Sequence, residues 1–312
     1  MKDLKVIFMG TPDFSVPVLK MLIKNTNVVL VVTKEDKEVG RHHVLTKSPI
    51  KVVALENNIK VITPKSVKKD YDEIINTPCD IIITCAYGNF IPKEVLDYPR
   101  LGCINVHASL LPKYRGGAPI HWALINGENK TGITIMYMDE KMDNGDIIEQ
   151  EEINIQDDDN VGILHDKLSL LGASLLEKVL PSIINGTNKR IKQDLDKVSF
   201  GYNVNREDER LDFNKTCKEI YNKVRGLYPF PVANILVNNE EFKVTKVDYK
   251  LCDVKSVSKV VDVTKDSILI SAKDGLVGIK RIKPYGKKEM DVKDYLNGVK
   301  KEDILKWEIN NE

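Results

Sequence analysis

Residues Leu4–Thr33 read LKVIFMGTPDFSVPVLKMLIKNTNVVLVVT, and this stretch indicates the fold. A first apolar run, Leu4–Met9, ends at Gly10-Thr-Pro. Val16–Ile23 follows with the apolar spacing of a helix, and Val28–Thr33 is a second apolar run. Continuous apolar strands that alternate with helices are typical of a parallel sheet covered on both faces.

The same alternation continues along the first half of the chain. Ser48–Asn57 predicts a helix, because Ser48-Pro49 supplies an N-cap residue followed by proline at the first helical position. Val61-Ile62 and Ile81–Ala86 are further apolar strands. We therefore predict an α/β fold with a doubly wound, mostly parallel, Rossmann-like N-terminal domain. Its sites should lie at the carboxyl ends of the strands.

The first turn of this sheet argues against a dinucleotide cofactor. A dinucleotide fingerprint at this place needs three glycines, for the tight turn, the approach of the pyrophosphate and the helix packing. The segment Gly10-Thr-Pro-Asp-Phe has one glycine and a proline. We therefore do not expect NAD or FAD here.

The pattern changes around residue 190. The polar stretch at 190–206 predicts a linker between a domain at 1–189 and a smaller domain at 207–312. Thr216–Val224 predicts a helix, and short apolar runs separated by turn residues predict a small β-barrel or sandwich. These runs are Ala233–Val237, Phe242–Val247, Lys259–Val263, Ser267–Ser271 and Leu276–Ile282.

Composition limits the possible function. Of 312 residues, 42% are hydrophobic and 30% charged, which allows a packed core. Lys plus Arg is 47 and Asp plus Glu is 46, so the net charge of +1 excludes a uniformly basic surface. Between Lys243 and Lys288, however, 12 cationic residues face 5 acidic ones. This local excess indicates either an ordinary lysine-rich surface or a nucleic-acid footprint.

Cellular location is also indicated by the sequence. Apolar runs such as Val28–Val32 are far shorter than the roughly 18 residues that a membrane span needs, so no membrane association is expected. A strand begins at Leu4, and we expect no targeting segment before it. The five cysteines form no CxxC pair, which is typical of small buried residues in a reducing compartment. We expect a cytoplasmic protein.

Asn105 and His107 are the first candidates for chemistry. They lie two residues apart at the end of an apolar run, so their side chains should point to the same face of a strand. An amide and an imidazole on one face suit a carbonyl that undergoes addition, because both can hold a developing oxyanion and the imidazole can move a proton. A structural histidine and a turn-forming asparagine would give the same pattern.

A carboxylate is the third candidate group. The strand Thr131–Met138 is followed by Asp139, Asp143 and Asp146, and Asn144-Gly145 favours a tight hairpin turn. One carboxylate directed at an imidazole would favour the protonated ring. Spacing alone does not choose among the three.

A loop at 109–117, which follows His107, is rich in proline and glycine. It could frame a flat heterocycle or be structural.

Together these motifs resemble the methionyl-tRNA formyltransferase family over essentially the whole chain. The Asn-x-His-x-Ser-Leu-Leu-Pro core with a downstream Asp-x-Gly-Asp is typical of folate-dependent formyltransferases as a group. The opening motif and the second domain narrow the resemblance to the tRNA enzymes. The matching segments are VIFMGTPDF from Val6, Gly40-Arg41, Ala86-Tyr-Gly, CINVHASLLP from Cys103, RGGAPI from Arg115, TGITIM from Thr131, MDNGD from Met142 and IKPYGKK from Ile282.

The resemblance implies formyl transfer from 10-formyltetrahydrofolate, as co-substrate, to the α-amino group of methionine on initiator tRNA. It implies no metal, and we expect a monomer. The second domain would be an OB-like barrel whose basic face supports the tRNA. By motif position, the catalytic residues are Asn105, His107 and Asp143. The resemblance also implies that Ser109, Leu110, Leu111 and Pro112 line the folate site and that Arg41 approaches the acceptor stem.

The chain departs from the family at the Arg41 loop, where His42-His43 stands in place of a more basic run. Three alternatives remain open. A formyltransferase for a small amine, such as a nucleotide sugar, would share the catalytic residues without needing the basic second domain. A formyltetrahydrofolate hydrolase would use water as the nucleophile. A non-catalytic tRNA-binding protein would need only the basic surface.

Overall fold

The computed structural model describes residues 1–40 and 43–310 and divides the chain into two compact units. Arg41 and His42 lie outside the described residues. Two short segments from the middle of the chain group with the C-terminal residues. Unit 1 contains Met1–Pro119, Lys130–Asn154 and His165–Tyr202, and unit 2 contains Ile120–Asn129, Ile155–Leu164 and Asn203–Glu312.

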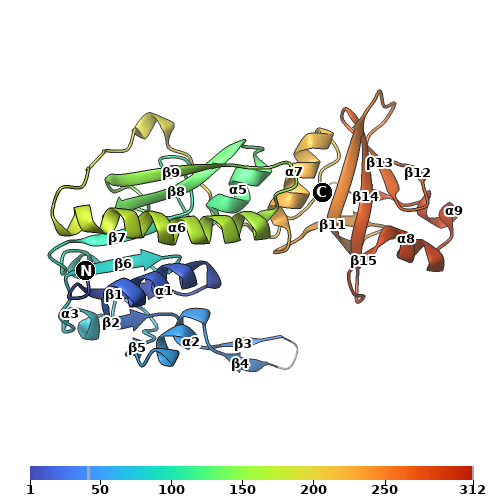
Figure 1. Ribbon diagram of the computed structural model, residues 1–312. Helices are drawn as coiled ribbons and strands as arrows, with labels where there is room; N and C mark the ends of the chain where they lie inside the picture. The colour runs from blue at the N-terminus through green and yellow to red at the C-terminus, as the bar shows by residue number, and fades with distance from the viewer. Residues whose placement is uncertain (41–42, 311–312) are drawn as a thin grey trace. The chain divides into compact units, whose positions relative to one another are not determined.

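Unit 1 is built on a seven-stranded sheet with the order β5-β2-β1-β6-β7-β8-β9 (Figure 1). The five strands from β5 to β7 are parallel, and β8 and β9 are antiparallel. This confirms the predicted mostly parallel sheet. The strands are β1 (Lys5–Gly10), β2 (Asn27–Val32), β5 (Val61–Ile62), β6 (Ile81–Cys85), β7 (Cys103–His107), β8 (Lys130–Tyr137) and β9 (Ile147–Asn154). A separate hairpin consists of β3 (Lys37–Val39) and β4 (Val44–Thr46).

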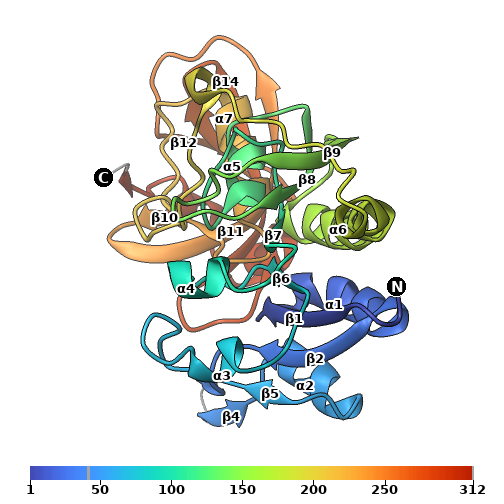
Figure 2. The same ribbon diagram turned by 90° about the vertical axis from the view of Figure 1, so that its left-hand side faces the viewer.

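Helices cover both faces of this sheet. Figure 2 shows α1 and α6 on one side and α3 and α4 on the other. Side chains alternate along β1, so Ile7 and Met9 pack with the α3–α4 side. As predicted, Ser48 caps α2 by accepting a hydrogen bond from the Lys51 backbone N–H. The helices are α1 (Val16–Asn25), α2 (Pro49–Glu56), α3 (Asp72–Ile75), α4 (Lys93–Leu96) and α6 (Val161–Ile184), with short 3-10 turns at η1 (Asp13–Ser15) and η2 (Leu195–Lys197).

The connection from β8 to β9 differs from the prediction. β8 ends at Tyr137 and β9 begins at Ile147, so the tight hairpin turn expected at Asn144-Gly145 is not formed. Within this long connection Asp143 has a φ of +49°, which is uncommon for a residue other than glycine. The turn prediction was wrong because side chains from distant parts of the chain hydrogen-bond this connection and fix it in another conformation.

Unit 2 has an antiparallel sheet with the order β12-β13-β14-β11-β10-β16, and β15 pairs with β14. This confirms the predicted short strands of the second domain. An isolated bridge from Lys259, before β12, to Glu308, before β16, links the two edges. The strands are β10 (Ala233–Val237), β11 (Glu240–Leu251), β12 (Val260–Val263), β13 (Ile268–Ala272), β14 (Gly275–Pro284), β15 (Met290–Asp291) and β16 (Ile309–Asn310).

The helices of unit 2 complete its core. The helix α7 (Cys217–Leu227) begins with a capping box, in which Thr216 and Glu219 each bond the other's backbone N–H. Its buried residues Ile220 and Val224 join the apolar cluster of the sheet. The other helices are α5 (Pro119–Ile125), α8 (Val292–Tyr295) and α9 (Lys301–Ile304), with a 3-10 turn at η3 (Leu296–Gly298). None of the helices within residues 1–40 and 43–310 has both the length and the apolar composition that a bilayer span needs.

The cysteines are free thiols. Cys85, Cys103 and Cys217 are buried as expected, Cys79 is partly buried, and Cys252 is exposed. Burial raises the pKa of the Cys85 thiol to about 12. The exposed Cys252 is therefore the more accessible nucleophile of this pair.

Candidate active site

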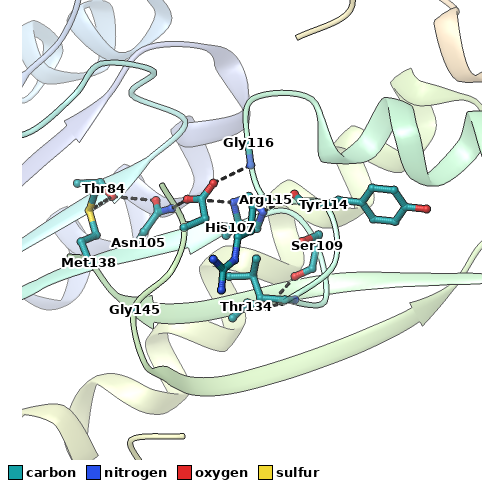
Figure 3. Close-up of polar contacts among 12 residues, drawn as sticks. Thr84, Asn105, His107, Ser109, Tyr114, Arg115, Gly116, Thr134, Met138 and Gly145 are labelled. Atoms are coloured by element: carbon teal, nitrogen blue, oxygen red, sulfur yellow. Dashed lines mark hydrogen bonds and ion pairs between the residues drawn. The ribbon is translucent and has the colours of Figure 1, made fainter. Parts of the chain in front are cut away.

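Asn105 lies on β7 at the carboxyl edge of the parallel strands, and its amide is oriented from the neighbouring strand. The Thr84 hydroxyl on β6 donates to the Asn105 Oδ1 at 2.8 Å (Figure 3). Thr84 is only 2% exposed, so water does not replace this donor. With Oδ1 occupied, the Nδ2 end of the amide faces the Asp143 carboxylate, 3.5 Å from its Oδ1.

His107 ends β7 and is buried, with 5% of its surface exposed. Its Nε2 lies 3.1 Å from the Tyr114 carbonyl oxygen, which can only accept, so Nε2 carries a proton and donates. Its Nδ1 lies 3.7 Å from the Asp143 Oδ1. Because Nε2 carries the single proton of a neutral ring, Nδ1 is an acceptor in the neutral imidazole and a donor only in the imidazolium.

Asp143 is the carboxylate that meets these two groups. Its Oδ2 accepts a 2.8 Å hydrogen bond from the Gly116 backbone N–H, which leaves Oδ1 directed at Asn105 and His107. The other two candidates are engaged elsewhere. Asp139 accepts from the Lys141 N–H and the Asn144 side chain, and Asp146 pairs with Arg190.

The three side chains predicted from sequence therefore converge in unit 1. The gaps of 3.5 and 3.7 Å to the Asp143 Oδ1 are longer than the usual 2.7–3.2 Å of a hydrogen bond. The Asn105 amide N–H, and His107 Nδ1 as a donor when the ring is protonated, thus point toward one carboxylate oxygen without being tied to it. Such donors can hold a developing oxyanion while the carboxylate oxygen accepts a proton.

The Ser109–Pro112 loop is held against the sheet by its own polar groups. The Ser109 hydroxyl donates to the Lys113 carbonyl at 2.6 Å, and its carbonyl accepts from the Thr134 hydroxyl at 2.6 Å (Figure 3). The Thr134 oxygen also accepts from the Leu111 N–H at 3.1 Å. Ser109 and Leu111 are buried, whereas Leu110 is half-buried. The Ser109 hydroxyl is thus used in shaping the loop.

Two residues of the site carried no catalytic expectation from sequence. Thr84 is an ordinary strand residue by pattern, and only its place beside Asn105 in the sheet gives it a role. Gln193 lies far along the chain and hydrogen-bonds the backbone of the Asp143 segment.

Among the described residues, no group of three His, Cys, Asp or Glu is arranged to hold a metal ion.

Known protein families and relatives match this chain over nearly its full length. The formyl transferase family model matches residues 4–180, and the model of the formyl transferase C-terminal domain matches residues 203–300. The methionyl-tRNA formyltransferase of Staphylococcus epidermidis is 48% identical over 298 residues, covering 95% of this chain and 96% of the relative. That of Staphylococcus aureus is 46% identical over 300 residues, covering 94% and 96%.

Solved structures share the fold. A sugar 3N-formyl transferase, WlaRD, crystallised in the presence of dTDP and 5-N-formyl-THF, superposes with a TM-score of 0.70 and 27% identity. The match covers 92% of this chain and 100% of that one. The N-formyltransferase from Helicobacter canadensis, in complex with folinic acid and dTDP-3-aminofucose, has a TM-score of 0.69 and 23% identity, with the same coverage.

Proposed function

The chain belongs to the methionyl-tRNA formyltransferase family, and from this premise we propose that it formylates the α-amino group of methionine on initiator tRNA for translation initiation. The formyl donor is a reduced folate, proposed to be 10-formyltetrahydrofolate. The observation that carries the proposal is the convergence of Asn105, His107 and Asp143 in a chain 48% identical to a methionyl-tRNA formyltransferase over almost its full length.

The geometry supports addition followed by elimination. The neutral methionine amine attacks the formyl carbon, a C–N bond forms, and the carbonyl π pair moves to oxygen. Asn105 Nδ2–H and the protonated His107 Nδ1–H bind this oxyanion more tightly than the planar carbonyl, which accelerates the step. Asp143 Oδ1 accepts the proton lost by the amine and relays it to N10 of the folate. The oxyanion pair then reforms the carbonyl as the bond from carbon to N10 breaks.

We propose two substrate contacts, one with the folate and one with the acceptor stem of the tRNA. Ser109 and Leu111 are buried and Ser109 is hydrogen-bonded within the protein, so we propose that this loop presents the half-buried Leu110 and its backbone to the folate ring. Arg41 is proposed to approach the acceptor stem on the strength of the family resemblance alone.

A cationic face of unit 2 supports a tRNA partner. On adjacent strands β11 and β14, Lys243 lies opposite Lys283 and Lys246 lies opposite Arg281. Like charges directly opposite each other destabilise a sheet, and a polyanionic partner would relieve this repulsion. Arg281 is partly neutralised by Asp291 at 3.0 Å, whereas Lys246 and Lys283 are exposed. We propose that residues 207–312 form an OB-like barrel that supports the tRNA, joined by a linker at 190–206 to a catalytic domain at 1–189.

Formylation of an amino sugar is the second candidate, because sugar N-formyltransferases share the fold. The test incubates the whole chain and 10-formyltetrahydrofolate with initiator methionyl-tRNA, elongator methionyl-tRNA or a dTDP-amino sugar. Acid-stable formyl product on the initiator species alone supports the proposal. Product on the sugar alone would replace it with the second candidate. Folate release without any acceptor would instead indicate a hydrolase, and activity retained by His107→Ala would point to a non-catalytic role for this site.

We propose further that the enzyme acts as a monomer in the cytoplasm, where initiator tRNA is aminoacylated. Light scattering of the purified chain at assay concentration tests the first part of this proposal. A dimer that persists on dilution would contradict it.

A further inference from the structure

We propose that Gln193 is a positioning residue that holds the Asp143 carboxylate in register with Asn105 and His107. The inference rests on the proposed function, because it assigns Asp143 a part in the reaction. Gln193 lies beyond residues 4–180, which the formyl transferase family model matches, so no motif singles it out.

The Gln193 amide joins two segments that carry parts of the site. Its Nε2 donates to the backbone carbonyls of Asp143, at 2.8 Å, and Gly145, at 2.9 Å. Its Oε1 accepts from two nitrogens of the Arg115 guanidinium, Nε at 3.1 Å and Nη2 at 2.7 Å. Gln193 is 9% exposed, and all four hydrogen bonds of its amide are made within the protein.

The Arg115 guanidinium binds the other end of the Gln193 amide, and together these two side chains form a clamp on residues 143–145. Arg115 is 6% exposed, and its remaining bond runs from Nη1 to the Asn144 Oδ1 at 3.0 Å. Arg115 is also the residue before Gly116, whose N–H binds the Asp143 Oδ2 at 2.8 Å. Figure 3 shows Arg115 and Gly116 on one loop facing Gly145. The backbone of residues 143–145 and one Asp143 carboxylate oxygen are thus tied to the same short loop.

This clamp is needed because the Asp143 conformation is not self-supporting. A φ of +49° places Asp143 in the left-handed region, which few residues other than glycine adopt, and the surrounding contacts impose it here. The Asp143 Oδ1 lies 3.5 Å from the Asn105 Nδ2 and 3.7 Å from the His107 Nδ1. A shift of about 1 Å at such a site lowers a rate by about 100-fold.

The test compares Gln193→Glu and Gln193→Leu in the full-length enzyme. Glutamate has nearly the same shape and still pairs with Arg115, but it cannot donate to the two carbonyls. We expect both variants to lose kcat by about 10- to 100-fold, with KM for methionyl-tRNA and for 10-formyltetrahydrofolate within about twofold. Lys192→Ala, an exposed neighbour, is the matched control and should keep wild-type kcat.

A double-mutant cycle with Asp143→Ala separates positioning from general support of the fold. If Gln193 acts through the Asp143 carboxylate, Gln193→Glu should cost nothing further in an Asp143→Ala background, measured by single-turnover formylation with excess enzyme. An equal, additive loss in both backgrounds would overturn the proposal, and so would a Gln193→Glu enzyme with wild-type kcat. If the leucine variant does not fold, the glutamate variant decides. A wild-type chain that fails to formylate methionyl-tRNA would instead reject the proposed function.

Discussion

Replacing Thr84 by valine should slow the reaction by changing the orientation of Asn105, without removing a contact to either substrate. The Thr84 side chain is 2% exposed, and its hydroxyl donates to the Asn105 Oδ1 at 2.8 Å. Valine has the same shape but no hydroxyl, so the Asn105 oxygen loses its donor. The amide is then free to rotate, and Nδ2 no longer has a fixed direction toward the reacting oxygen.

The size of the effect has a lower and an upper bound. The lower bound is the net value of one neutral hydrogen bond, about 1 kcal/mol, which corresponds to roughly fivefold in rate. The upper bound is loss of the whole oxyanion donor, about 3 kcal/mol, which corresponds to roughly 150-fold. Because Thr84 acts on the transition state through Asn105, we expect this loss in kcat, with KM for methionyl-tRNA unchanged.

The assay measures initial rates of methionyl-tRNA formylation while each substrate is varied, with thermal unfolding measured in parallel. Thr84→Ser keeps the hydroxyl and should recover most of the rate. A Thr84→Val enzyme with wild-type kcat would refute the reasoning that Asn105 acts as an oriented donor. Equal losses of rate in Thr84→Ser and Thr84→Val would also contradict this role, since the hydroxyl would then not be the group that orients Asn105.

Three further predictions follow from the structure. Gly132→Ala should destabilise the protein by on the order of 3 kcal/mol in urea titrations, because the added Cβ would overlap a carbonyl of β9; an unchanged midpoint would contradict the close packing of β8 on β9. Iodoacetamide at neutral pH should modify the exposed Cys252 and spare Cys85, because burial raises the pKa of the Cys85 thiol to about 12. Peptide mass spectrometry measures the labelling of both thiols, and rapid labelling of Cys85 would argue against its burial. Lys246→Ala and Lys283→Ala should each raise KM for methionyl-tRNA and lower the slope of log K against log salt by roughly 0.7–0.9, because one phosphate contact is lost; no change in slope would remove this face from the tRNA interface.

Local pattern was enough for much of the fold. The apolar runs and the Ser48-Pro49 signal predicted β1, α1, β2 and α2 because strand and helix periodicities and capping are properties of neighbouring residues. The same reasoning left the 24-residue helix α6 unassigned, although it covers β7 and β8 through Gly172. It also failed at Asn144-Gly145, because turn statistics describe a chain free of outside contacts, and here Arg115 and Gln193 bond this segment.

The amino-acid sequence by itself determined the class of fold, the resemblance to a family and the pairing of Asn105 with His107, because two residues on one strand necessarily share a face. Residue spacing left Asp139, Asp143 and Asp146 equivalent, and the family resemblance implied Asp143 by motif position without a physical reason. Tertiary structure supplied that reason, because a backbone N–H from a loop 27 residues away binds one Asp143 carboxylate oxygen and leaves the other directed at Asn105 and His107. Thr84 and Gln193 were likewise hidden, since a hydrogen bond between distant residues leaves no local periodicity in the sequence.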